Sequence, residues 1–174
     1  MKRSIALWQV IGFAFVSLGG TLLHYLYGWT GESPVIAVIS GINESTWEHM
    51  KLLFVPMLLF AWIQHLLFPE KQNFWCVKAV GVLFGTVMIP VLFYTANGAF
   101  GQTPDWLNIS FFFVAAAMAF LLEWWLFRLN AIPCKHSYLA WTLLIGVAVL
   151  FAAFTFTPPE IPLFRDPATG TYGI

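Results

Sequence analysis

Two histidines and a glutamate in this sequence have side chains suited to chemistry. Glu44 and His49 stand close together in the segment Asn-Glu-Ser-Thr-Trp-Glu-His, and His24 precedes that segment. Two imidazoles and a carboxylate around an open position are a common ligand set for zinc or iron. A proton shuttle is the alternative chemistry for the same groups. We therefore treat His24, Glu44 and His49 as candidate catalytic residues and as candidate ligands of a divalent metal such as zinc.

The spacing of these residues is not a known zinc signature. The segment lacks the His-x-x-x-His spacing of the usual helical zinc motif, so the metal hypothesis depends on the fold bringing His24 close. Haem held between His24 and His49 is a less favoured alternative, since nothing else in the sequence marks a haem pocket.

The segment also has the features of a helix start. Ser45 followed by Glu48 matches a capping box, in which the serine hydroxyl and the glutamate carboxylate each accept from a free backbone amide. In that register Glu44 and His49 take the N′ and N4 positions, which usually hold an apolar pair. Helix initiation explains Ser45 and Glu48, but it does not require a carboxylate and an imidazole at the other two positions. We expect Glu44 and His49 to approach each other.

The composition places these residues in a membrane protein. Of the 174 residues, 60% are hydrophobic and only 9% are charged, whereas a soluble domain has about 25% charged residues. Apolar runs long enough to cross a bilayer as helices occupy 5–27, 46–68, 74–96, 106–127 and 137–157. We expect an all-α bundle of about five transmembrane helices, a single domain over 1–157, and a tail over 158–174. The formal net charge of zero argues against a nucleic-acid partner.

Lysines and arginines indicate the orientation of the bundle. With the N-terminus inside, the cytoplasmic side holds Lys2, Arg3, Lys71, Lys78, Arg128 and Lys135, and the outer side holds Lys51 and Arg165. This asymmetry follows the positive-inside rule, so we expect a cytoplasmic N-terminus and an external C-terminus. Residues 34–42 are apolar but too short to span, and we expect them to be re-entrant or interfacial. Cys76 and Cys134 fall near the cytoplasmic side, where we expect separate thiols and no disulfide.

Polar side chains from several segments gather at the outer end in this arrangement. Besides the three candidate ligands, they are Asn43, Glu48, Lys51, Tyr94, Asn97, Asp105 and Asn108. Because polar and charged groups are unfavourable in hydrocarbon, their one-sided grouping predicts a polar pocket in the outer leaflet. The tail contains Leu163, Phe164, Tyr172 and Ile174 and could dock over this pocket as a lid, a disordered terminus being the alternative. At the inner end, His65 and Glu123 form an expected polar pair, with interfacial anchoring as the simpler explanation.

Two motifs give the chain a resemblance. The stretches Asn-Glu-Ser-Thr-Trp-Glu-His-Met-Lys at 43–51 and Asp-Pro-Ala-Thr-Gly-Thr-Tyr-Gly at 166–173 resemble a family of short bacterial integral membrane proteins classed as a domain of unknown function. The resemblance covers essentially the whole chain in length and span layout. It implies a location in the bacterial inner membrane, and it assigns no reaction, substrate or catalytic residue.

Three classes of function remain open at this point. The first is a protein whose outer-leaflet pocket binds or acts on a lipid-like or other apolar small molecule, with or without a metal. The second is a transporter or channel, although such proteins usually contain repeats and bind near the midplane. The third is a structural or accessory subunit. In each class the membrane lipid is an expected partner.

Overall fold

The chain folds as a bundle of long helices. The computed structural model describes residues 2–67, 73–130 and 132–174, and its long helices are α1 (Lys2–Trp29), α3 (Thr46–Leu67), α4 (Phe74–Phe100), α5 (Asp105–Leu129) and α6 (Ser137–Phe156). A short helix, α2 (Pro34–Ala37), follows α1, and a 3-10 turn, η1 (Pro162–Phe164), follows α6. All five long helices are long and apolar enough to cross a membrane. The prediction of an all-α, multi-pass membrane protein is confirmed.

The helices agree closely with the predicted spans and mostly run longer. The predicted ends at 27 and 96 become Trp29 in α1 and Phe100 in α4, while residue 68, the predicted end of the second span, lies outside the described residues. Helix α5 ends at Leu129. The Asn130 amide still donates to the Leu126 carbonyl, and the left-handed backbone of Asn130 (φ 51°) then ends the helix. Helix α6 stops just before Pro158, which has no amide hydrogen to continue it.

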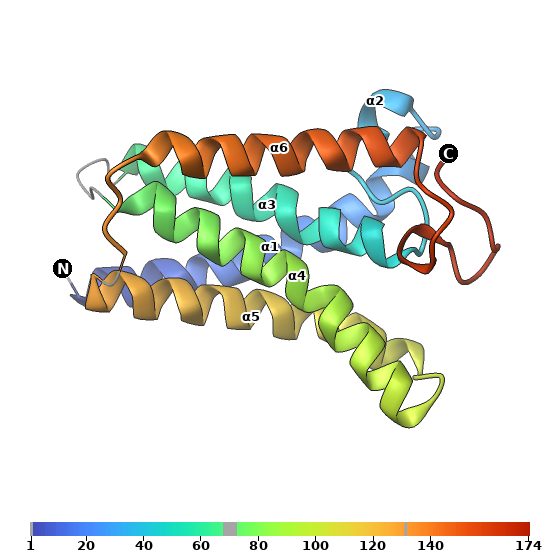
Figure 1. Ribbon diagram of the computed structural model, residues 1–174, viewed down its shortest axis with the longest axis horizontal. Coiled ribbons are helices and arrows are strands. Elements are labelled where there is room, and N and C mark those ends of the chain that lie inside the picture. The colour runs from blue at the N-terminus through green and yellow to red at the C-terminus, as the bar shows by residue number, and fades with distance from the viewer. Residues whose placement is uncertain (1, 68–72, 131) are drawn as a thin grey trace.

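Helix α3 lies at the centre of the bundle and positions the others (Figure 1). It packs against α1 and α4, while α4 also packs against α5 and α6, and α1 against α5. Of the five spans, α3 is the most buried and α1 and α6 are the least. The outer surface carries exposed Leu18, Leu22 and Val149. Such an apolar surface suits contact with lipid, where helices satisfy their own backbone hydrogen bonds.

One end of the α4–α5 hairpin leans away from the rest of the bundle (Figure 1). Pro90 lies inside α4 and cannot donate a backbone hydrogen bond, which is the usual cause of a bend in a helix. Beyond it, the hairpin tip is held by Thr103, whose backbone amide donates to Asn97 Oδ1 over 3.0 Å and whose hydroxyl lies 2.6 Å from Asn108 Oδ1. The lean separates this tip from the ends of α1 and α3.

The predicted separate thiols at the opposite end are wrong. Cys76, in the first turn of α4, and Cys134, in the segment before α6, form a disulfide with their Cα atoms 5.8 Å apart. The two cysteines are 58 positions apart in the chain, and only the return of the α5–α6 connection beside α4 brings them together. Sequence spacing alone does not reveal that proximity.

The predicted pair of His65 and Glu123 is also wrong. Glu123 lies 2.5 Å from the Lys78 ammonium, and the two side chains are 0% and 1% exposed. The rings of Phe60, Phe74, Phe120 and Phe127 surround that ammonium at 5.6 to 6.0 Å. Lys78 was expected to mark the cytoplasmic surface, but it belongs to the interior, where only a carboxylate could balance its charge. His65 instead packs against Phe74 and Trp75.

Candidate metal centre

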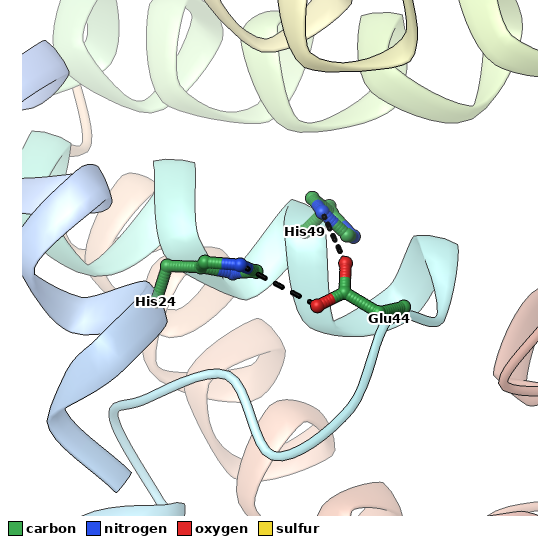
Figure 2. Close-up of side chains that lie close together, drawn as sticks. All are labelled: His24, Glu44 and His49. Atoms are coloured by element: carbon green, nitrogen blue, oxygen red, sulfur yellow. Dashed lines mark ion pairs between the residues drawn. The ribbon is translucent and has the colours of Figure 1, made fainter. Parts of the chain in front are cut away.

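His24, Glu44 and His49 converge at the end of the bundle beneath the leaning hairpin. His24 comes from α1, His49 from the first turns of α3, and Glu44 from the loop just before α3 (Figure 2). His24 Nε2 lies 3.4 Å from Glu44 Oε1, and His49 Nε2 lies 3.6 Å from Glu44 Oε2. One ligand atom from each residue falls within 4.8 Å of the other two. The expected approach of Glu44 to His49 and to His24 is therefore observed.

These separations suit a small divalent cation. Bonds of about 2.1 Å to a tetrahedral zinc place neighbouring ligand atoms about 3.4 Å apart. Both contacts of Glu44 have nearly that length, and each joins a different oxygen of the carboxylate to a different histidine. The two imidazole rings have centroids 5.7 Å apart, and three ligand atoms, one from each residue, lie within 4.8 Å of one another.

A backbone hydrogen bond fixes which nitrogen of His49 faces Glu44. His49 Nδ1 lies 2.9 Å from the Ser45 carbonyl oxygen, to which it must donate a proton. In a neutral ring the lone pair is then on Nε2, which is the atom that faces Glu44. A lone pair directed at a carboxylate is repelled unless a proton or a cation lies between them. Histidines that bind metals commonly hold their second nitrogen against a backbone carbonyl in this way.

The loop before α3 is held in place by a helix cap. Ser45 Oγ accepts the Glu48 amide over 3.3 Å, which confirms half of the capping box. Asn43 Oδ1 takes the other half, because it accepts the Ser45 amide over 3.0 Å. The prediction that the Glu48 carboxylate returns to the cap residue is wrong, since it accepts the Ile42 amide instead, over 3.2 Å. The cap leaves the side chain of Glu44 free to point at the histidines.

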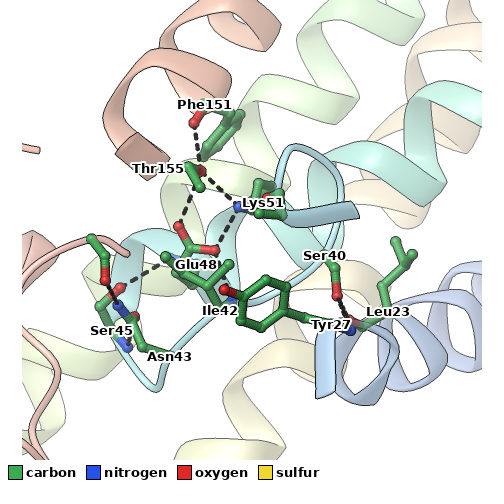
Figure 3. A network of polar contacts seen from close by, with 12 residues as sticks. Leu23, Tyr27, Ser40, Ile42, Asn43, Ser45, Glu48, Lys51, Phe151 and Thr155 are labelled. Atoms are coloured by element: carbon green, nitrogen blue, oxygen red, sulfur yellow. Dashed lines mark hydrogen bonds and ion pairs between the residues drawn. The ribbon is translucent and has the colours of Figure 1, made fainter. Parts of the chain in front are cut away.

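The Glu48 carboxylate belongs to a buried network around Lys51 (Figure 3). The Lys51 ammonium lies 2.6 Å from Glu48 Oε2, 2.7 Å from the Ala37 carbonyl and 2.8 Å from Thr155 Oγ1. All three of its donors are therefore satisfied. This network joins α3 to the α2 segment and to α6. Lys51 is 0% exposed, so its predicted place in the polar pocket is wrong.

The segment expected to be re-entrant supports His24. Residues 34–37 form α2, and the chain then turns so that Ser40 is 0% exposed against α1. The Ser40 hydroxyl donates to the Leu23 carbonyl and accepts the Tyr27 amide over 3.0 Å. In an uninterrupted helix these two backbone groups would pair with each other. Ser40 therefore engages the turn of α1 that carries His24 (Figure 3).

The three residues line a cavity of about 620 Å³ between the leaning hairpin and the ends of α1 and α3. Of the predicted pocket residues, Asn97, Asp105 and Asn108 also line it. Tyr94 is exposed and does not line it, and neither do Asn43, Glu48 and Lys51, which have the structural roles given above. The other lining residues are Thr46, Ile89, Phe93, Gln102, Thr103, Ile109, Phe111, Phe112, Pro167 and Ala168.

The C-terminal tail forms part of the cavity wall through Pro167 and Ala168. Phe164 fixes the base of the tail, since it is 4% exposed and its ring centroid lies 4.7 Å from that of Trp47. Asp166 then shapes the turn by accepting the Ala168 amide and the Thr169 hydroxyl, each over 2.8 Å. The expected docking of the tail is observed, although Ile174 at its end is exposed.

The chain matches one family of proteins. A family whose description is "Family of unknown function (DUF6512)" matches residues 1–174. The chain belongs to this family. No curated protein and no solved structure matches the chain. The resemblance noted from the two motifs is thus confirmed as membership of an uncharacterised family, and within this DUF6512 chain both motifs lie at the candidate centre, one as the cap before α3 and one as the turn over the cavity.

Proposed function

We propose that this DUF6512 protein binds a divalent metal, with zinc as the best fit, through His24, Glu44 and His49. The observation that carries the proposal is the convergence of His24 Nε2 and His49 Nε2 on one carboxylate, with His49 Nδ1 held against the Ser45 carbonyl. A cation between these groups removes the repulsion between lone pairs and uses the geometry already present. Two nitrogens and a carboxylate leave a coordination position open, as catalytic zinc sites do.

The open position would face the cavity. A metal there can polarise a carbonyl or phosphoryl oxygen of a molecule that enters. The cavity wall combines polar groups from Asn97 and Asn108 with the rings of Phe93, Phe111 and Phe112, so it suits a molecule with a polar and an apolar part. We therefore propose that the protein binds or acts on a lipid-like small molecule at a metal-assisted site.

We place the cavity at the outer face of a bacterial inner membrane. The C-terminal end of α5 and the connection to α6 lie at the opposite end of the bundle, beside the N-terminus (Figure 1). These segments carry Arg128 and Lys135. Lys51 and Lys78 no longer count toward the positive-inside comparison, because both are buried in ion pairs. Lys71 and the side chains of Lys2 and Arg3 lie outside the described part of the chain. The remaining charges still favour a cytoplasmic N-terminus.

A one-sided pocket fits the packing of the bundle better than a transport path does. A Cβ atom added at Gly19 would lie 3.2 Å from Pro56, and one added at Gly85 would lie 2.8 Å from the Ala119 methyl. Helices α1 and α3, and α4 and α5, are thus tightly packed below the cavity. Zinc- or lipid-dependent solute flux across proteoliposome membranes would favour a transport path over a one-sided pocket.

Metal content tests the proposal directly. Protein purified without a metal-affinity tag and loaded with zinc should retain about one equivalent per chain after desalting, as measured by plasma mass spectrometry. Cobalt in place of zinc should give the intense visible bands of a tetrahedral site. His24→Gln, Glu44→Gln and His49→Gln should each weaken zinc affinity by at least about tenfold.

The matched control is His65→Gln, which removes a histidine from the other end of α3 and leaves the candidate ligands unchanged. It should retain zinc as the unmodified protein does. Retention of zinc by the His24 and His49 variants, with circular dichroism showing that they are folded, would rule out the proposed centre.

A further inference from the structure

A second, smaller hollow adjoins the cavity on its lipid-facing side. It has a volume of about 120 Å³ and lies among α1, α3 and α5. His24, His49, Ile109 and Phe112 line both hollows. We call the smaller hollow the side groove. The candidate metal ligands therefore stand where the cavity and the side groove meet.

The rim of the side groove is largely apolar and exposed on the surface of the bundle. The rim carries Tyr25 on α1 and Phe113 and Ile109 on α5, whose exposed fractions are 53%, 37% and 57%. All three belong to helices long and apolar enough to cross a membrane. Aromatic and aliphatic side chains on such a rim suit an acyl chain, which could pass from the bilayer to the candidate centre without crossing water. The groove is short, so most of that chain would stay among the membrane lipids.

The cavity end has the opposite character. Two carboxylates, Glu44 and Asp105, line it, and its lining residues among those the structure describes include no lysine or arginine. Glu44 is committed to the histidines, whereas Asp105 has no ion pair among the described contacts. With a metal bound at the histidines, one end of the cavity would be positive, and the Asp105 carboxylate would make the other end negative. The ring of Phe93 on the wall can also interact with a cation.

We infer that the ligand is a zwitterionic membrane lipid with a terminal amine, of the phosphatidylethanolamine class. Its phosphate oxygen meets the metal end, its ammonium meets Asp105, and one acyl chain leaves through the side groove. The inference rests on the proposed function for the position of the head group. A purely anionic lipid would place no cation against Asp105, and a water-soluble ligand would have no use for the side groove.

Photo-crosslinking in nanodiscs tests this inference. Zinc-loaded protein is reconstituted with a trace of phosphatidylethanolamine, or of phosphatidylglycerol, carrying a diazirine on one acyl chain. After illumination, mass spectrometry maps the labelled residues. We expect labelling concentrated at Tyr25, Ile109 and Phe113, several-fold greater for the ethanolamine lipid. Asp105→Asn should bring the two lipids to equal labelling.

The matched variants are Ile109→Trp, which fills the side groove, and Ile145→Trp, which adds the same bulk to an exposed position of α6 (56% exposed). The first should abolish labelling at Tyr25 and Phe113, and the second should leave it unchanged. Labelling spread evenly over the lipid-facing helices, or equal labelling by both lipids in the unmodified protein, would overturn the inference.

The two proposals fail separately. Zinc content is measured on every sample, so zinc binding without localised labelling would refute the lipid inference and leave the metal centre intact. Localised, ethanolamine-dependent labelling in protein that binds no zinc would refute the metal centre and leave the lipid site.

Discussion

The Lys51 ammonium and the Glu48 carboxylate lie 2.6 Å apart with no more than 2% of either side chain exposed. Their remaining polar atoms reach the Ile42 amide, the Ala37 carbonyl and Thr155. A buried ion pair contributes little more to stability than two apolar residues would, but removing one partner leaves an unpaired buried charge. The network thus fixes the start of α3, and with it His49, relative to α2 and α6.

Removing the lysine alone should destabilise the protein strongly. We expect Lys51→Met to lower the free energy of unfolding by about 3–5 kcal/mol, because Glu48 stays buried without its counter-charge. Glu48→Gln combined with Lys51→Met should recover much of that loss. Unfolding in mixed detergent micelles, followed by tryptophan fluorescence, measures both effects. Lys135→Met, at an exposed lysine, is the control and should change stability by less than about 0.5 kcal/mol. A double variant as unstable as the single one would contradict this account.

A methyl group at Gly81 should disturb the other buried ion pair. A Cβ atom there would lie 2.5 Å from Glu123 Oε1, so Gly81→Ala must push the carboxylate away from Lys78. We expect a loss of about 1–3 kcal/mol in unfolding free energy. Gly98→Ala is the matched control on the same helix, because nothing lies within 4 Å of its added Cβ. That variant should be neutral or stabilising by up to about 1 kcal/mol. Equal changes in unfolding free energy at the two positions would show that helix propensity, and not a clash with Glu123, determines the effect of Gly81→Ala.

The Ser40 hydroxyl should influence the metal centre without touching it. Ser40→Ala removes both of its hydrogen bonds to the turn of α1 that carries His24. We expect zinc affinity to fall by about two- to tenfold, the equivalent of one ordinary hydrogen bond. Competition with a fluorescent chelator measures the affinity. Thr21→Ala, which removes a hydroxyl that bonds only to Ser17 of its own helix, should leave the affinity unchanged; an equal loss there would contradict the role of Ser40.

Much of the fold could be predicted because lipid imposes simple rules. Apolar runs of sufficient length had to become helices, and the spans were placed within a few residues. The approach of Glu44 to His49 was also predictable, since both lie within one helix-start motif. The position of His24 beside them did not follow from the sequence alone, because it depends on the packing of α1 against α3.

Most of the errors concern partners that are distant in sequence. Lys51 and Lys78 were assigned to the membrane surface because a lone lysine in an apolar run usually reaches an interface. Glu123 beside Lys78, and Ala37 and Thr155 around Lys51, become partners only once the helices pack, although Glu48 is only three positions from Lys51 in the chain. The same is true of the Cys76–Cys134 bond and of Pro167 and Ala168 in the cavity wall. Gln102 and Thr103 carried a usable signal, because they stand between the polar ends of two predicted spans.

The redox state of Cys76 and Cys134 in the cell depends on which way the protein crosses the membrane. In the orientation that we propose, the Cys76–Cys134 end lies in the cytoplasm, where thiols are kept reduced. We therefore expect the bond in purified, air-exposed protein and free thiols in cells quenched with acid before alkylation, as counted by mass spectrometry. Reduction of the purified protein should lower its unfolding free energy by about 2–4 kcal/mol. Cysteines found oxidised in quenched cells would argue for the reverse orientation, with the candidate centre facing the cytoplasm.

The tail should limit access to the cavity. Pro167 and Ala168 line it, and Phe164 anchors the preceding residues against Trp47. A chain ending at Phe164 keeps that anchor and loses the wall, so its fold should persist while the cavity opens. The only two cysteines of the sequence are joined in the disulfide, and Thr46→Cys therefore places a single reactive thiol on the cavity lining.

We expect maleimide to label this thiol several-fold faster in the shortened chain than in the full one, because Thr46 is only 8% exposed while the tail is docked. Asp166→Ala, which removes the carboxylate that shapes the turn, should give an intermediate rate. Ser137→Cys, at an exposed position on the opposite end of the bundle, should label equally in both chains. The readout does not depend on a bound metal. If Thr46→Cys reacts at the same rate with and without residues 165–174, the tail does not limit access to the cavity.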